Sequence, residues 1–195
     1  MKQTIFILTL ILFPRFSLYA EQKLPVFTGE IVFVSDRDGN REIYAIKSDG
    51  TGERRITSNE VEDINPRWAP DKSKIVYSSY CKGTFEICVI TSIGGSPSFL
   101  THVGYDCIHP SFSRDGKKIV FCRSHDLQGL YFELYMMNAD GTGMERMTRY
   151  QDRSFSWRVF SPDYSPNGDK IIFSFCEEDL YVRDLKSGTD TKLMQ

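Results

Sequence analysis

The stretch Pro110–Phe121, which reads PSFSRDGKKIVF, decides the fold because copies of it lie on both sides in the chain. Pro66–Tyr77 reads PRWAPDKSKIVY, and Pro162–Phe173 reads PDYSPNGDKIIF. Each copy has a proline, an aromatic residue two positions later, a turn, a lysine, and then a run of β-branched and aromatic residues. The chain therefore repeats one supersecondary unit.

The unit continues beyond this stretch. The apolar runs begin at intervals of 44, 44 and 52 residues, at Ile31, Ile75, Ile119 and Ile171. A second segment of constant length follows each run, opening with an acidic residue and turning at glycine; its copies are Glu42–Thr57, Glu86–Thr101, Glu133–Thr148 and Asp179–Met194. We expect four short strands in each unit, joined by tight turns, with the units at about residues 25–57, 66–101, 110–148 and 162–194.

The apolar runs are continuous instead of alternating, as in IVFC at 119–122. Such strands are covered on both faces of their sheet. Small antiparallel sheets that recur every 44 residues and are covered on both sides predict an all-β propeller of about four four-stranded blades. In the first unit the first strand is degenerate, since Pro25–Gly29 keeps the proline and the aromatic residue but loses most of the turn.

These residues resemble the WD40-like propeller repeat of the TolB family, and Pro110–Thr148 matches its pattern nearly throughout. The resemblance implies an exported β-propeller. In TolB the propeller is a non-catalytic periplasmic protein that docks a peptidoglycan-associated lipoprotein. TolB has six blades and a separate α/β domain ahead of them, whereas this chain has four units directly after its N-terminal segment, which puts membership of a Tol-Pal complex in question. Closure as a four-bladed ring, association with another copy, and an incomplete propeller are all compatible with four units.

The N-terminal twenty residues predict a secretory signal peptide. Lys2 precedes the apolar run Ile5–Phe13, which is too short to span a bilayer, and Ala20 offers a cleavage site before Glu21. We therefore expect a mature propeller domain at 21–195 in the periplasm or outside the cell, with no membrane span. A net charge of -2 and a pI near 5.9 argue against nucleic acid as a partner.

The chain has five cysteines, Cys81, Cys88, Cys107, Cys122 and Cys176. Cys88 and Cys122 fall inside apolar runs, where a thiol behaves as a small hydrophobic group. Their spacing matches no zinc or redox motif, so we interpret the cysteines as mostly structural, with one bridged pair left open.

Catalytic motifs are absent from the sequence: it has no G-x-S-x-G, H-E-x-x-H, P-loop or Rossmann glycine pattern, and we expect no cofactor. We interpret His102, His109 and His125 as ordinary histidines of connecting segments. The segment Asp36–Asn40 resembles the start of a calcium loop, but its twelfth position is Lys47, so we favour a hairpin turn. The recurring acidic residues are read as a repeated hairpin contact, to a backbone N–H or a basic residue of a neighbouring blade, in preference to a ring of carboxylates; they are Glu42, Glu86, Glu133 and Asp179.

The connection between the third and fourth units is the predicted partner-binding segment. It places residue types typical of interface hot spots within ten positions, namely Tyr150, Arg153, Phe155, Trp157 and Arg158. Coverage of the adjacent blade by Phe155 and Trp157 is the alternative. The sequence thus favours a protein-binding scaffold of the cell envelope that docks another envelope protein; the alternative is the propeller portion of a larger enzyme, a prolyl oligopeptidase-type hydrolase or a polysaccharide lyase.

Overall fold

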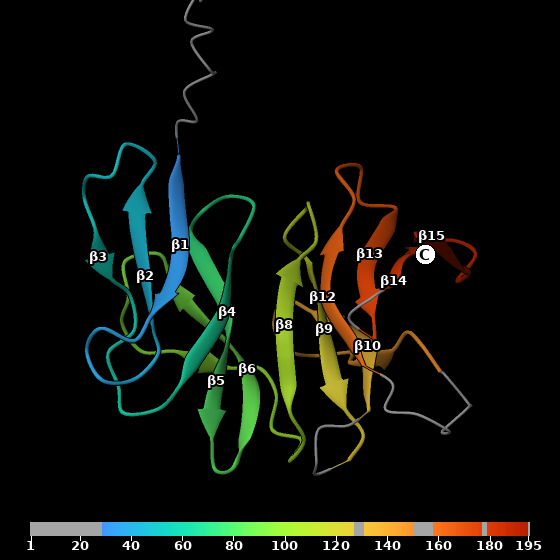
Figure 1. Cartoon of the computed structure of the whole chain (residues 1–195), viewed down its shortest axis with the longest axis horizontal. Coiled ribbons are helices and arrows are strands. Elements are labelled where there is room, and N and C mark those ends of the chain that lie inside the picture. Colours follow the sequence, from blue (N-terminus) through green and yellow to red (C-terminus); the bar gives the residue numbers. More distant parts are fainter. Residues whose placement is uncertain (1–28, 127–130, 150–157, 177–178, 195) are drawn as a thin grey trace, which may run out of the picture.

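The computed structural model describes residues 29–126, 131–149, 158–176 and 179–194. Four antiparallel sheets follow one another in chain order, and we call them blades 1 to 4 (Figure 1). Blades 1 and 2 comprise β1 (Glu30–Ser35), β2 (Glu42–Lys47), β3 (Arg54–Arg55), β4 (Asp63–Trp68), β5 (Lys74–Cys81), β6 (Thr84–Thr91) and β7 (Ser98–Phe99). Blades 3 and 4 comprise β8 (Cys107–Phe112), β9 (Lys118–Ser124), β10 (Phe132–Asn138), β11 (Glu145–Arg146), β12 (Val159–Tyr164), β13 (Lys170–Phe175), β14 (Asp179–Asp184) and β15 (Asp190–Met194).

Each blade is a meander in which consecutive strands pair. Blades 2, 3 and 4 have four strands in the orders β4-β5-β6-β7, β8-β9-β10-β11 and β12-β13-β14-β15. The described part of blade 1 has three, β1-β2-β3, because its expected first strand at 25–29 falls almost wholly outside the described residues. The predicted all-β, four-unit propeller is confirmed, and no helix in the described ranges is long and apolar enough to cross a membrane.

The first strand of each four-stranded blade lies innermost. Strand β8 contacts both β4 and β12 in the neighbouring blades, and β4 also contacts β1 and β2. These inner strands begin earlier than the proline-aromatic pair suggested: β8 starts at Cys107 and β12 at Val159. The prediction that His109 belongs to a connecting segment was therefore wrong, because it lies inside β8.

The core consists of three clusters, one between each pair of successive blades. The second strand of blades 2 and 3 is buried on both faces, as the continuous apolar runs predicted: Ile75, Val76 and Tyr77 are fully buried, and so are Ile119–Cys122. Apolar faces of neighbouring sheets thus cover one another, which removes their side chains from water.

Glycines in the outer turns let neighbouring blades approach closely. Gly94 (φ 88°) and Gly141 (φ 87°) follow the third strands of blades 2 and 3, and a Cβ on either would lie 3.0 Å from a backbone oxygen of the preceding blade. Gly50, at the same repeat position in blade 1, has nothing within 4 Å of such an atom. Among the described residues, no preceding blade therefore approaches blade 1 at this turn.

Candidate functional site

The inner strands share an irregularity that the sequence repeat did not reveal. The pairing of β4, β8 and β12 with the next strand shifts at a bulge that contains the repeat proline, between Ile64 and Arg67, Ile108 and Ser111, and Phe160 and Asp163. The residue before each proline has positive φ: 54° at Asn65, 55° at His109 and 49° at Ser161. Non-glycine residues in this region cost about 1–3 kcal/mol each and concentrate at functional sites.

Polar side chains gather at these bulges. We call the inner polar surface the set formed by the residues before and after the three prolines: Asn65, Arg67, His109, Ser111, Ser161 and Asp163. Contacts join it across blades 3 and 4, since Ser111 Oγ donates to Asp163 Oδ1 at 2.7 Å and Ser161 Oγ lies 3.5 Å from His109 Nδ1. Arg67, Ser161 and Asp163 are exposed. The surface is thus continuous from β8 to β12 and accessible from solvent.

Burial and one nearby charge set the ionisation of the histidine on the inner polar surface. Burial, and then the nearby Arg67 charge, lower the pKa of His109 to about 4, so the imidazole is neutral at neutral pH. A base with so low a pKa removes a proton from serine poorly, and the 3.5 Å between Ser161 Oγ and the ring is longer than a nucleophile-base hydrogen bond. The surface offers neutral donors and acceptors, one cation at Arg67 and one anion at Asp163.

One buried polar atom on this surface lacks a partner in the described part of the chain. Asn65 Oδ1 is inaccessible and accepts no hydrogen bond there. Buried polar atoms without a protein partner are usually satisfied by water or by a ligand group. The residue types before the prolines carried a usable signal, because asparagine and histidine are enriched at positive φ.

Most of the predicted partner-binding segment lies outside the described residues, including Tyr150, Arg153, Phe155 and Trp157. Arg158 is described and half-buried, and its carbonyl oxygen accepts a 2.8 Å hydrogen bond from Cys176 N. It directly precedes β12, so the segment leads into the strand that carries Ser161 and Asp163.

The recurring acidic residues fasten the last strand of a blade to its third strand. Thr57, Thr101 and Thr148 each donate a side-chain hydrogen bond to a buried glutamate in the third strand of the blade. The same hydroxyl accepts a hydrogen bond of 2.9–3.0 Å from the backbone N–H of the residue that follows this glutamate. The glutamates are Glu42, Glu86 and Glu133. In blade 4, Lys192 Nζ lies 2.8 Å from Asp179. We call the hydrogen-bonded pair of threonine and glutamate in blades 1 to 3 the Glu-Thr latch. A repeated hairpin contact was the right interpretation.

Of the two expected kinds of partner, the backbone N–H is confirmed at Glu42, where Asn59 N donates to Oε1 at 2.8 Å. Arg55 and Arg146, which bond Glu42 and Glu133 at 3.0 Å and 2.7 Å, belong to the same blade as their carboxylate. Burial alone would raise the pKa of Glu42, but hydrogen bonds from Thr57, Asn59, Asn40 and Arg55 outweigh it and hold the pKa below its usual value. These carboxylates therefore stabilise each blade from within.

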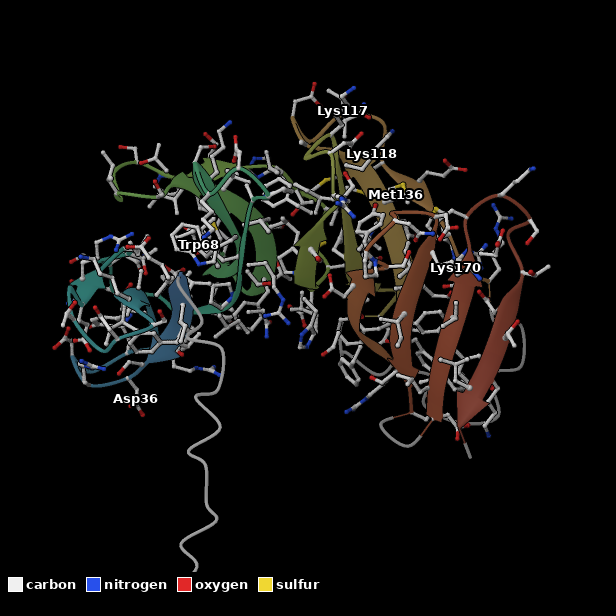
Figure 2. The ribbon with its side chains drawn as sticks, turned by 90° about the horizontal axis from the view of Figure 1, so that it is seen from above. Asp36, Trp68, Lys117, Lys118, Met136 and Lys170 are labelled. Atoms are coloured by element: carbon white, nitrogen blue, oxygen red, sulfur yellow. The ribbon has the colours of Figure 1, made fainter. Side chains whose placement is uncertain are left out.

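The segment Asp36–Asn40 forms a turn between β1 and β2, in which Gly39 N donates to Asp36 O at 3.0 Å. Asp38 accepts from Tyr44 and Arg55, and Asn40 donates to Glu42 and Val61 O. Asp36 lies at the edge of blade 1, and the described residues contain no cluster of three or more His, Cys, Asp or Glu suited to a metal (Figure 2). Cys81, Cys88, Cys107 and Cys122 are free thiols.

Two shallow grooves flank the turn at Ser113–Gly116 of blade 3. One, of about 440 Å³, lies against blade 2 and includes Ala69, Lys74 and Phe112. The other, of about 530 Å³, lies against blade 4 and includes Lys118, Met136 and Tyr164; Figure 2 shows Lys118 and Met136 on this side. Both form where neighbouring blades diverge, and their lining mixes Arg114 with Asp115, so neither has a single sign of charge.

Known proteins of similar sequence or structure share this architecture. The Tol-Pal system protein TolB of Desulfosudis oleivorans is 29% identical over 133 residues, which cover 64% of this chain and 27% of that protein. The crystal structure of TolB from Acinetobacter baumannii superposes with a TM-score of 0.70 at 25% identity, over 87% of this chain and 42% of that one. Dipeptidyl-peptidase 5 of Porphyromonas endodontalis is 24% identical over 115 residues, 59% of this chain and 17% of that protein.

The chain spans between 27% and 36% of the length of the curated TolB relatives that it matches over most of its own length. A family model described as the TolB beta propeller domain matches residues 25–153, well over half of the sequence. With four successive antiparallel blades and this match, the chain belongs to the TolB β-propeller domain family.

Proposed function

We propose that this TolB-family propeller is exported and serves as a non-catalytic protein-binding module of the cell envelope. The observation that carries the proposal is the inner polar surface: three strained bulges present hydrogen-bonding groups and two opposite charges without a competent nucleophile-base pair. Such a surface suits a polar segment of a partner protein. The similarity to a Tol-Pal system protein supports an envelope partner.

The site we propose combines the inner polar surface with the predicted segment Tyr150, Arg153, Phe155, Trp157 and Arg158. Because Arg158 adjoins β12, aromatic side chains of that segment can extend the contact beyond Ser161 and Asp163. Residues 1–20 act as the signal peptide in this proposal, and the mature domain at 21–195 works in the periplasm or outside the cell.

Binding is tested by capture from envelope extract, with the purified chain as bait. Two double variants, Arg67→Ala with Ser161→Ala and Trp157→Ala with Arg158→Ala, should each lose the captured partner while melting like the parent. The control, Lys72→Ala with Lys117→Ala, changes two exposed turn lysines and should retain it. Capture that is equal for the parent and both double variants would contradict the proposed site.

Export is tested separately, since it does not depend on the partner. Expression of the full chain in a Gram-negative host should give a periplasmic product whose mass corresponds to cleavage after Ala20. A product that stays uncleaved in the cytoplasm would contradict the signal-peptide prediction.

The similarity to dipeptidyl-peptidase 5 favours one second candidate, the propeller portion of a hydrolase. On that alternative the chain would shape access to an active site formed elsewhere. A downstream reading frame that encodes a G-x-S-x-G nucleophile elbow would favour the hydrolase, whereas capture of an envelope protein that the Arg67→Ala and Ser161→Ala double variant abolishes would favour binding.

A further inference from the structure

The four blades form an open arc. Among the described residues, blade 1 contacts blade 2, blade 2 contacts blade 3 and blade 3 contacts blade 4, but no strand of blade 4 contacts blade 1. Figures 1 and 2 show the two blades at opposite ends of the molecule. Within the described ranges, blade 1 therefore has a start face that no other blade contacts, and blade 4 has an end face that no other blade contacts.

The start face exposes a residue that the repeat otherwise buries. Ile31 is 47% exposed, whereas the residues at the same position in the other blades, Ile75, Ile119 and Ile171, are 0% exposed. Arg37 covers the neighbouring rings, with its guanidinium 4.7 Å from the centre of Tyr44 and 5.8 Å from that of Phe33. Ile31 remains the uncovered apolar centre of this face.

The end face shows the same contrast. Leu193 is 52% exposed, whereas Ile56, at the same repeat position in blade 1, is 5% exposed. The equivalent residues Leu100 and Met147 are partly buried against the following blade. On the same blade, Leu180 and Val182 are only half-buried, although their counterparts in blade 1, Ile43 and Ala45, are fully buried.

The residues at these two repeat positions share one apolar cluster wherever two blades meet within the chain. Ile56 shares a core cluster with Ile75, Leu100 packs in the cluster of Ile119, and Met147 packs in the cluster of Ile171. In each of the three internal interfaces, the residue after the last strand of one blade thus belongs to the same apolar cluster as the second strand of the next blade. The missing fourth pair is Leu193 with Ile31.

We infer that two copies of this chain associate head to tail, with the end face of blade 4 in one copy packed against the start face of blade 1 in the other. A contact of this kind repeats an interface that the chain already forms between its own blades. Because each copy has one face of each kind, two contacts form and close a ring of eight blades, within the usual range of four to eight.

The closed pair should be favoured over a single contact. A sheet face of about four strands, spaced by about 4.8 Å and about 20 Å long, is smaller than the roughly 800 Å² per partner of a standard interface. Two contacts between the same two chains bring the total towards the standard range, and the second forms at the high effective concentration set by the first.

A charge-swap experiment tests the pairing, with mass measured by light scattering over a dilution series. The parent should have twice the mass of one chain. Ile31→Lys and Leu193→Glu should each be a single chain, because each substitution affects both contacts of the ring. Mixing the two variants should restore the double mass, since one contact is then unmodified and the other places lysine opposite glutamate.

Ile93→Lys and Ile93→Glu are the matched controls, because Ile93 is 86% exposed but lies in an outer turn of blade 2, away from both faces. Both should keep the double mass, and circular dichroism should show every variant folded. A parent that is a single chain at all concentrations overturns the inference. So does an association that Leu193→Glu leaves intact, which would mean that two start faces pair, or a mixture that stays at the mass of one chain.

Discussion

At the scale of single residues, Asp63 is the buried group that the repeat does not require. It stands at the start of β4, fully buried, where blades 3 and 4 have Cys107 and Val159. Asn59 Nδ2 donates to its Oδ2 at 2.8 Å, while its Oδ1 has no partner within the described ranges. Burial raises the pKa of Asp63, an effect that the nearby polar side chains of Ser79, Asn59 and Thr57 only partly offset.

This pKa shift predicts a pH dependence of stability. Below the ordinary Asp pKa of about 3.9 the carboxyl is protonated in both states, and as pH rises the unfolded chain ionises first, so this group's stabilising contribution is lost as pH rises towards its folded pKa. Asp63→Asn removes that loss. Thermal melts of the variant and the parent should show the variant gaining relative stability between about pH 4 and neutrality.

Asp71→Asn is the opposing control for this titration. Asp71 is exposed, and the backbone N–H of Ser73, followed by its hydroxyl, lowers the pKa of Asp71. Its contribution is therefore present at neutral pH and lost on acidification, so this variant should lose relative stability as pH rises. Parallel pH curves for the two variants would contradict the assignment of opposite shifts.

At the scale of the element, the Glu-Thr latch holds the two-residue strands β3, β7 and β11 in their blades. In blade 2, Thr101 is 1% exposed, donates to Glu86 and accepts from Ile87 N at 2.9 Å. A strand that forms so few ladder bonds depends on this side chain, because β7 pairs with β6 at only two residues.

Thr101→Val should therefore destabilise the protein by about 1–3 kcal/mol, because it leaves the buried Glu86 carboxylate and the Ile87 N–H short of a partner at nearly constant volume. Thr101→Ser keeps the hydroxyl and should cost less. Urea unfolding followed by tryptophan fluorescence measures the stability of both variants. A Thr101→Val midpoint equal to that of the parent would show that the latch contributes little to stability.

At the scale of the whole molecule, the same repeat position has a different energetic weight in different blades. Ile75 is buried between blades 1 and 2, and Ile31 is 47% exposed on the start face. Trp68 packs against the same cluster, and Figure 2 shows it between the two blades. Burial against a neighbouring blade, and not the residue type, sets how much each isoleucine contributes to the free energy of unfolding.

Ile75→Ala should cost about 2–5 kcal/mol, and Ile31→Ala less than about 1 kcal/mol in the single chain, since only the former leaves a core cavity. Urea unfolding at concentrations where light scattering shows one chain gives both values. A comparable loss for the two substitutions would mean that the start face is covered within a single chain.

The sequence by itself determined the all-β propeller, its four units and the turn at Asp36–Asn40, because turn residues and strand burial act over short distances and recur in every unit. The bulges at Asn65, His109 and Ser161, the own-blade partners of Glu42 and Glu133, and the open faces at Ile31 and Leu193 were decided only by the tertiary structure. Each of these depends on which strand or blade lies alongside, and residues distant in the sequence settle that. A repeat can specify its own blade, but only the assembled arc shows which of its faces has no neighbour.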